Sequence, residues 1–246
     1  MTPDRPSRTV LTHWLSEGTG RLLDAVDALD DARLVGRSTL PGWTNAHLLT
    51  HVARNADALG NLLDWAVTGV ESPMYPHGAI RRAADIEAGA ARPPEAIRAD
   101  VRAGATRLRD CLAAVPEAAW GREVRTAQGR LVRADRVPWL RVREVWIHVV
   151  DLGTGATFAE LPGDLAQALL DDVVGTLAAK NAGCPALVLH DRTGGSVRTT
   201  RSPAPGEIVD HVEGSAAELL GWLTGRGDGA GLTHSATAPP TPPPWL

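Results

Sequence analysis

The chain has 246 residues, of which 43% are hydrophobic and 22% are charged. These proportions match globular proteins, so they exclude global disorder and allow one large domain or two small ones. The formal net charge of −4 argues against a nucleic-acid-binding protein, which usually carries a basic stripe. No run approaches the roughly 20 apolar residues of a membrane span, and residues 1–10 contain no apolar signal-peptide core. We therefore expect a cytoplasmic protein.

The two cysteines, Cys111 and Cys184, do not form a disulfide framework. Neither belongs to a CxxC pair, which also excludes a cysteine-rich zinc site. We interpret both as small buried apolar residues rather than as nucleophiles.

The first part of the chain predicts four long helices. Apolar residues recur at helical spacing over 10–30, 45–67, 94–115 and 138–152. Thr44 is a good N-cap for the second of these helices, because its hydroxyl can accept a hydrogen bond from the first turn. Four helices are the number needed for a four-helix bundle.

Two connections within this part differ in length and character. The segment 69–93 contains Pro73 and Pro76 and predicts a long loop, which is where a lid or crossover is expected. The segment 127–135 predicts a loop or a short hairpin around Gly129.

The pattern changes after Gly155, where short β-type runs appear among helical ones. We predict helices over 162–179 and 215–223 and strands over 186–190, 196–200 and 208–212. The sequence therefore predicts an α+β fold, with a four-helix bundle over 1–155 and a small α/β module over 156–246.

The chain ends in the proline-rich segment 239–246, which predicts an extended conformation. Its last residues, Trp245 and Leu246, are large and apolar. We expect them to pack back onto the body of the protein.

Two of the predicted helices carry residues of the metal-ligand type on one face. Glu144 and His148 are four positions apart, and so are His47 and His51, with Asn55 one turn further. Side chains with this spacing leave the same face of a helix. Bundles build metal sites from facing helices, and catalytic zinc takes three ligands of the His and Glu type.

Each motif also has a structural interpretation. A Glu and a His one turn apart often stabilise a helix surface, and a histidine among leucines is often a hydrogen-bonded core residue. However, the helix that carries Glu144 and His148 is apolar on most of its surface, so its polar face is expected to be buried. A buried carboxylate is costly unless it is paired or binds a metal. Spacing alone does not choose between His47 and His51 as the third ligand.

The remaining chemistry-bearing residues give weaker signals. The other histidines are isolated in the sequence, and no two make a spaced ligand pair: His13, His77, His190, His211 and His234. No nucleophile elbow, dinucleotide-binding fingerprint or phosphate-binding loop is present. The glycine-rich segment 225–229 follows a predicted helix, and it is either a plain loop or a device that positions Arg226 for a carboxylate.

Several fragments occur together in an order and spacing that are highly specific. They are Gly42-Trp43-Thr44, His47-Leu48, His51-Val52-Ala53, Asn55-Ala56, Asn61-Leu62, Pro73-Met74-Tyr75, Thr126-Ala127-Gln128-Gly129-Arg130, Arg143-Glu144-Val145-Trp146-Ile147-His148, Val150-Asp151-Leu152-Gly153, Gly225-Arg226-Gly227 and Trp245-Leu246. On these fragments nearly the whole chain resembles the mycothiol-dependent maleylpyruvate isomerases, within the DinB-like metal-binding four-helix-bundle superfamily.

The resemblance implies a metal site formed by His51, Glu144 and His148, with His47 in a structural or supporting role. It also implies that Arg226 is the functional arginine of the C-terminal module. A small insertion after Tyr75 departs from the family pattern. We therefore do not carry a family role over to Arg81 or Arg82, and both remain candidates for binding an anion.

The implied reaction is the cis–trans isomerisation of maleylpyruvate to fumarylpyruvate, with Zn²⁺ or another divalent ion and mycothiol as cofactors. A carbon–carbon double bond rotates only after a nucleophile has added to it, and a metal-bound thiol is deprotonated at neutral pH. Arg226 would hold a substrate carboxylate. The family suggests a monomer. Two alternatives stay open: another mycothiol-dependent transfer reaction, or a non-catalytic binding protein stabilised by metal.

Overall fold

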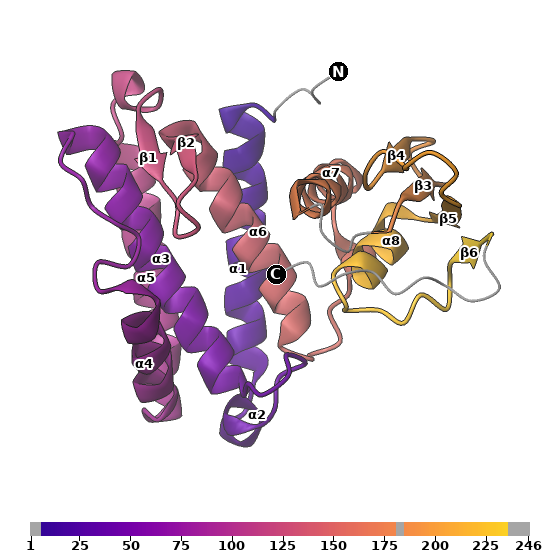
Figure 1. Ribbon diagram of the computed structural model, residues 1–246. Helices are drawn as coiled ribbons and strands as arrows, with labels where there is room; N and C mark the ends of the chain where they lie inside the picture. Colours follow the sequence, from indigo (N-terminus) through magenta and orange to yellow (C-terminus); the bar gives the residue numbers. More distant parts are fainter. Residues whose placement is uncertain (1–5, 181–184, 236–246) are drawn as a thin grey trace. The chain divides into compact units, whose positions relative to one another are not determined.

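The computed structural model has a mixed helix and sheet architecture and describes residues 6–180 and 185–235 (Figure 1). Contacts divide the chain into two compact units. The N-terminal unit is Pro6–Thr154, and the C-terminal unit begins at Gly155. No helix within the described ranges combines the length and the apolar composition needed to cross a bilayer.

The four predicted long helices are present in the N-terminal unit. They are α1 (Arg8–Ala28), α3 (Asn45–Thr68), α5 (Pro94–Ala114) and α6 (Val137–Asp151). Helix α3 packs against α5 and α6, and α1 packs against α6, so the helices lie side by side (Figure 1).

The ends of α3 follow from local hydrogen bonding. The Thr44 hydroxyl accepts a hydrogen bond from the backbone N–H of His47 at 3.3 Å, and the His47 ring accepts one from the backbone N–H of Thr44 in return. This reciprocal capping box satisfies donors that the first turn would leave unpaired. The helix ends at Gly69, whose φ of 76° is left-handed and suits glycine.

Two short helices lie in segments that periodicity did not mark. Helix α2 (Asp31–Val35) precedes α3, and α4 (Gly78–Ala90) lies within the segment 69–93 that we predicted to be a loop. That prediction was wrong for α4. The prolines and glycines before α4 favoured a loop over the whole segment, although α4 itself is amphipathic, with Ile86 and Gly89 buried.

A hairpin precedes α6, flanked by the 3-10 turns η1 (Glu117–Ala119) and η2 (Ala134–Arg136). Its strands, β1 (Glu123–Arg125) and β2 (Leu131–Arg133), pair antiparallel. Gly129 has a φ of 78° in the turn, so the predicted hairpin around this residue is present.

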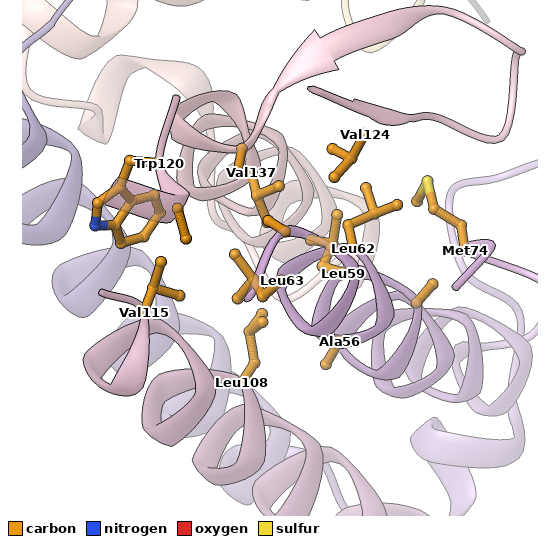
Figure 2. Close-up of a cluster of buried hydrophobic side chains, with 14 residues drawn as sticks. Ala56, Leu59, Leu62, Leu63, Met74, Leu108, Val115, Trp120, Val124 and Val137 are labelled. Carbon is orange, nitrogen blue, oxygen red and sulfur yellow. The ribbon is translucent and has the colours of Figure 1, made fainter. Parts of the chain in front are cut away.

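The hairpin closes one end of the core of the N-terminal unit (Figure 2). The apolar side chains there come from α3, α5, the hairpin and α6. Members of the cluster include Leu59, Leu62, Leu63, Leu108, Trp120, Val124 and Val137. Burying one such side chain stabilises the folded state by about 1.5–3 kcal/mol. Val137, the first residue of α6, belongs to this cluster, so the cluster holds the start of α6 in place.

Helices α1 and α6 approach closely at Trp146. The indole is fully buried, and its Nε1 donates a hydrogen bond to the Trp14 carbonyl at 2.8 Å. Gly18 lies beneath the ring, where a β-carbon would come within 2.3 Å of Nε1. Trp146 is therefore a core residue of this unit.

The C-terminal unit combines a small sheet with two helices. Its elements are η3 (Phe158–Glu160), α7 (Gly163–Lys180), β3 (Leu187–Asp191), β4 (Val197–Thr199), β5 (Asp210–Gly214), α8 (Ala216–Leu223) and β6 (Thr233–His234). The strand order is β4-β3-β5-β6, with β3 and β5 parallel and the outer pairs antiparallel. Helices α7 and α8 pack against each other and against the sheet.

Three details of this unit differ from the prediction. Strand β5 begins at Asp210, and Ile208 is 88% exposed. Strand β6 has two residues, which is too short to leave a periodic pattern. His190 and His211, which are isolated in the sequence, lie together: their rings stack, and Nε2 of the first is 3.0 Å from Nδ1 of the second.

Two predictions concern residues outside the described ranges. They are the burial of Cys184 and the packing of Trp245 and Leu246 onto the body of the protein.

Candidate metal centre

Three side chains converge between α3 and α6. His51 lies in the second turn of α3, and Glu144 and His148 lie one turn apart on α6. Their ligand-type atoms all lie within 4.8 Å of one another. Nε2 of His51 is 3.1 Å and Nε2 of His148 is 3.3 Å from the same Oε2 atom of Glu144. Two imidazole nitrogens and a carboxylate thus point at one place.

The cluster is enclosed but open to solvent on one side. The side chains of His51 and His148 are 9% and 13% exposed, whereas that of Glu144 is 25% exposed. The His51 ring also packs edge-on against Trp43, with 5.6 Å between ring centroids. Glu144 is therefore the most exposed of the three side chains, although its Oε2 atom is itself buried.

Asp151 holds His148 in place. Its carboxylate is fully buried and lies 2.8 Å from Nδ1 of His148, and it also accepts a hydrogen bond from the Thr39 hydroxyl. A carboxylate on the far nitrogen fixes the tautomer of a metal-binding histidine and leaves Nε2 for the metal. Asp151 was not among the predicted site residues, although its position three residues after His148 was a usable signal.

The protonation equilibria of the cluster are coupled. Burial opposes ionisation of Glu144, but hydrogen bonds from His148 and His51 hold its pKa well below the usual value. Burial lowers the pKa of His51. Burial would also lower the pKa of His148, but the hydrogen bonds to Asp151 and Glu144 raise it. The centre therefore contains an ionised carboxylate between two imidazoles whose pKa values are shifted in opposite directions.

His51 has a cationic neighbour from α4. Nη2 of Arg82 lies 2.9 Å from Nδ1 of His51, and its guanidinium carbon is 5.1 Å from the centre of the Tyr75 ring. Burial raises the pKa of the Tyr75 hydroxyl, so it is protonated at neutral pH. From the sequence, Arg82 was only a candidate for binding an anion, and Tyr75 had no role in the site. Both lie in or next to α4, the helix that periodicity missed.

His47 and Arg81 lie elsewhere on the same helices. The His47 ring caps α3 through Thr44, and its other nitrogen lies 3.2 Å from a carboxylate oxygen of Glu87. Arg81 is exposed and pairs with Asp85 at 2.8 Å. The geometry thus places His51, and not His47, in the cluster.

A buried arginine ties the two ligand-bearing helices together. Arg141 on α6 donates from Nη1 to the Val52 carbonyl and to the Asn55 side chain on α3, both at 2.8 Å. Burial lowers its pKa to about 10, so it still carries its charge at neutral pH. Asn55, which the sequence placed on the ligand stripe, is therefore a partner of Arg141.

Arg226 belongs to the C-terminal unit, in the loop after α8. Gly225 has a φ of 73°, and the Arg226 backbone N–H donates to the Gly221 carbonyl at 2.7 Å. The side chain is half-buried and donates from Nη1 to the Thr224 carbonyl at 2.8 Å. The loop thus holds Arg226 in a defined conformation.

The described cysteine has no part in the cluster. Cys111 is half-buried rather than fully buried, and burial raises the pKa of its thiol. A thiol with a raised pKa is mostly protonated at neutral pH and is a poor nucleophile. Thiol chemistry at this centre would therefore need a thiol from outside the described part of the chain.

Comparison with known proteins places this chain in a family. Residues 15–153 match the family model described as the mycothiol maleylpyruvate isomerase N-terminal domain. Two crystal structures of the mycothiol-dependent maleylpyruvate isomerase, one of them a histidine-to-alanine mutant, are similar at TM-scores of 0.88. Their identities to this chain are 38% and 37%, over 96% of this chain and 97% of theirs. No curated protein matches the sequence. The chain belongs to the mycothiol maleylpyruvate isomerase family.

Proposed function

We propose that the protein isomerises maleylpyruvate to fumarylpyruvate with mycothiol as its thiol cofactor and a divalent metal ion bound by His51, Glu144 and His148. The observation that carries this proposal is the convergence of both Nε2 atoms on one Glu144 oxygen, in a chain of this family. The proposed fold is a DinB-like four-helix bundle over 1–155 with a small α/β module over 156–246.

The residues present fit a metal ion of the zinc type. Two imidazoles and one carboxylate are the donor set of many catalytic zinc sites, and the Asp151 contact to His148 is the support that such sites use. A bound Zn²⁺ lowers the pKa of a coordinating thiol, so that it reacts as the thiolate at neutral pH. The same donors also accept other divalent ions, and zinc is our proposal among them.

The chain's own residues would then bind the metal ion and orient the substrate. His51, Glu144 and His148 would hold the ion, and Asp151 fixes the ring of His148. Mycothiol, when bound, would supply the nucleophilic thiol that the double bond needs before it can rotate. We assign Arg226 the role of holding a substrate carboxylate through a charge-assisted hydrogen bond.

We also propose that the protein acts as a monomer in the cytoplasm, where a thiol cofactor stays reduced. Elution from a sizing column at the mass of one 26.0 kDa chain would test the monomer.

The decisive experiment is a spectrophotometric assay of maleylpyruvate conversion by purified protein, with zinc and mycothiol added or omitted separately. We expect conversion that requires both. A protein shown to hold zinc that converts nothing with mycothiol present would contradict the isomerase proposal, and it would favour transfer of the thiol to another electrophile.

Two histidines on α3 provide a matched pair of variants for the same assay. We expect His51→Gln to lose bound zinc and at least about 100-fold of the activity, because a metal ligand is removed. His47→Gln should keep both, because glutamine can replace histidine in the capping box. Arg226→Ala should keep zinc while kcat/KM falls. Zinc content by atomic emission and steady-state kinetics would check these outcomes, and full activity in His51→Gln would contradict the metal site.

A further inference from the structure

The two histidines of the cluster differ at the nitrogen that faces away from Glu144. Nδ1 of His148 faces the Asp151 carboxylate, which accepts hydrogen bonds. Nδ1 of His51 faces Nη2 of Arg82 at 2.9 Å. A guanidinium group has donors and no acceptor, so Arg82 must donate and Nδ1 of His51 must accept. The proton of a neutral His51 ring therefore sits on Nε2, which lies 3.1 Å from Glu144.

This arrangement competes with metal binding at His51. A metal ion takes the lone pair of Nε2, and the proton of the neutral ring then moves to Nδ1. Nδ1–H and the Arg82 guanidinium would be two donors facing each other. The hydrogen bond from Arg82 to His51 and ligation through Nε2 of His51 therefore exclude each other. His148 has no such conflict, because Asp151 already favours a proton on Nδ1.

Arg82 is also a cation to which the described residues offer no acidic partner. Arg81, its neighbour on α4, pairs with Asp85, and Arg54 on α3 pairs with Asp100. Within residues 6–180 and 185–235, no carboxylate lies within ion-pair distance of Arg82, and its buried Nε atom has no hydrogen-bond partner. Its guanidinium donates hydrogen bonds to Nδ1 of His51 and to the Tyr75 hydroxyl, and it also lies against the Tyr75 ring.

A half-buried guanidinium that loses one of its polar contacts, and that has no carboxylate partner among the described residues, is stabilised by an anion in exchange. A carboxylate suits it best, since the planar fork of arginine binds both carboxylate oxygens at once. Arg82 contacts Nδ1 of His51 and therefore lies one imidazole ring away from the ligand-type atoms. A carboxylate of a substrate bound at the centre that extends past this ring would meet the guanidinium.

We propose that Arg82 is a carboxylate anchor of this centre, which exchanges its hydrogen bond to His51 for a carboxylate of the substrate when a metal ion binds Nε2 of His51. The inference rests on the proposed function for the identity of the substrate, an oxo-dicarboxylate. Arg82 would then be a second arginine that holds a substrate carboxylate, besides Arg226.

Three variants of the full chain test the anchor: Arg82→Met, Arg82→Lys and the control Arg81→Met, which removes an exposed charge one residue away. Zinc affinity is measured by competition with a chromogenic chelator. Binding of maleate, a cis-dicarboxylate, is measured by calorimetry on the zinc-loaded protein without mycothiol. Thermal melting of each variant checks that it is folded.

We expect Arg82→Met to bind zinc about three- to tenfold more tightly, because no hydrogen bond to His51 has to be broken first. It should bind maleate at least about tenfold more weakly, because the carboxylate loses a charge-assisted pair. Arg82→Lys should fall between wild type and Arg82→Met for maleate, and Arg81→Met should match wild type in both measurements.

Unchanged maleate affinity in Arg82→Met, or an equal loss in Arg81→Met, would overturn the anchor. Zinc affinity that does not rise in Arg82→Met would overturn the competition at His51. The outcome is separable from the proposed function. If the wild type isomerises maleylpyruvate and Arg82→Met has the same KM as the wild type, the anchor alone is refuted. If the wild type binds maleate through Arg82 but does not isomerise maleylpyruvate, the isomerase alone is refuted.

Discussion

The hydrogen-bond partners of two nitrogen atoms determine which tautomer each histidine of the candidate centre adopts before a metal ion binds. Nδ1 of His148 has an acceptor, and Nδ1 of His51 has a donor. Since the tautomer of an imidazole follows the partner of its far nitrogen, the two histidines start from different states. The contribution of Asp151 can be tested separately from that of Arg82.

We expect Asp151→Asn to lower zinc affinity by about 10- to 100-fold, because an amide orients His148 less firmly and supplies no negative charge. Glu117→Gln is the control, since it removes a charge from an exposed ion pair with Arg8. Chelator competition measures both variants. Equal zinc affinity in Asp151→Asn and wild type would show that the buried carboxylate does not support the metal.

At the scale of elements, the sequence predicted α3 and α6 because each has a strong apolar stripe and a clear stop signal. The helical spacing of Glu144 and His148, and of His47 and His51, also predicted that each pair lies on one face of its helix. Spacing left His47 and His51 equivalent, since they lie on the same stripe, and the family resemblance made the choice. Arg82 was missed as a partner of His51 because the segment that contains α4 was predicted to be a loop and the contact joins residues 31 positions apart.

The contact between α1 and α6 gives a test of packing. We expect Gly18→Ala to lower the free energy of unfolding by about 1–3 kcal/mol, because its β-carbon would overlap the Trp146 ring. Gly20→Ala lies on the same helix with nothing within 4 Å of the new β-carbon. It should be neutral or stabilising by up to about 1 kcal/mol, because alanine favours the helix. Urea unfolding followed by circular dichroism measures both, and equal stability of the two variants would contradict this packing.

At the scale of the whole molecule, the family assignment covers both units. The structure of the N-terminal unit can be predicted from its sequence more completely than that of the C-terminal unit. The N-terminal unit is built from long periodic helices. In the C-terminal unit, β3 and β5 pair in parallel although β4 lies between them in the chain. Such a pairing depends on contacts distant in sequence, which is why the contact between His190 and His211 could not be predicted from their spacing.

Asp191 links the stability of the C-terminal unit to pH. Its buried carboxylate accepts hydrogen bonds from the backbone N–H groups of Thr193 and Gly194 and from the Gln167 side chain. Burial opposes ionisation, but these bonds, with the Gln167 bond largest, lower the pKa of Asp191. Because the folded pKa lies below the unfolded one, the stabilisation is complete above about pH 4 and is lost as the pH falls further.

We therefore expect Asp191→Asn to lower the free energy of unfolding of this unit by about 1–3 kcal/mol at pH 7, with a smaller difference from wild type below pH 4. Glu213→Gln, on the exposed face of the neighbouring strand β5, should change it by less than about 0.5 kcal/mol. Urea titrations at several pH values measure the difference, and a difference that grows as the pH falls would contradict the role of the carboxylate.

The antiparallel course of α3 and α6 has an electrostatic consequence. His51 lies near the start of α3, His148 lies in the last turn of α6, and their rings are 5.1 Å apart. The positive end of one helix dipole therefore meets the negative end of another at the same place. The end of α6 favours a cation and the start of α3 favours an anion, each by about 0.3–1 kcal/mol. The backbone itself thus suits a cation and an anion bound side by side better than either ion alone.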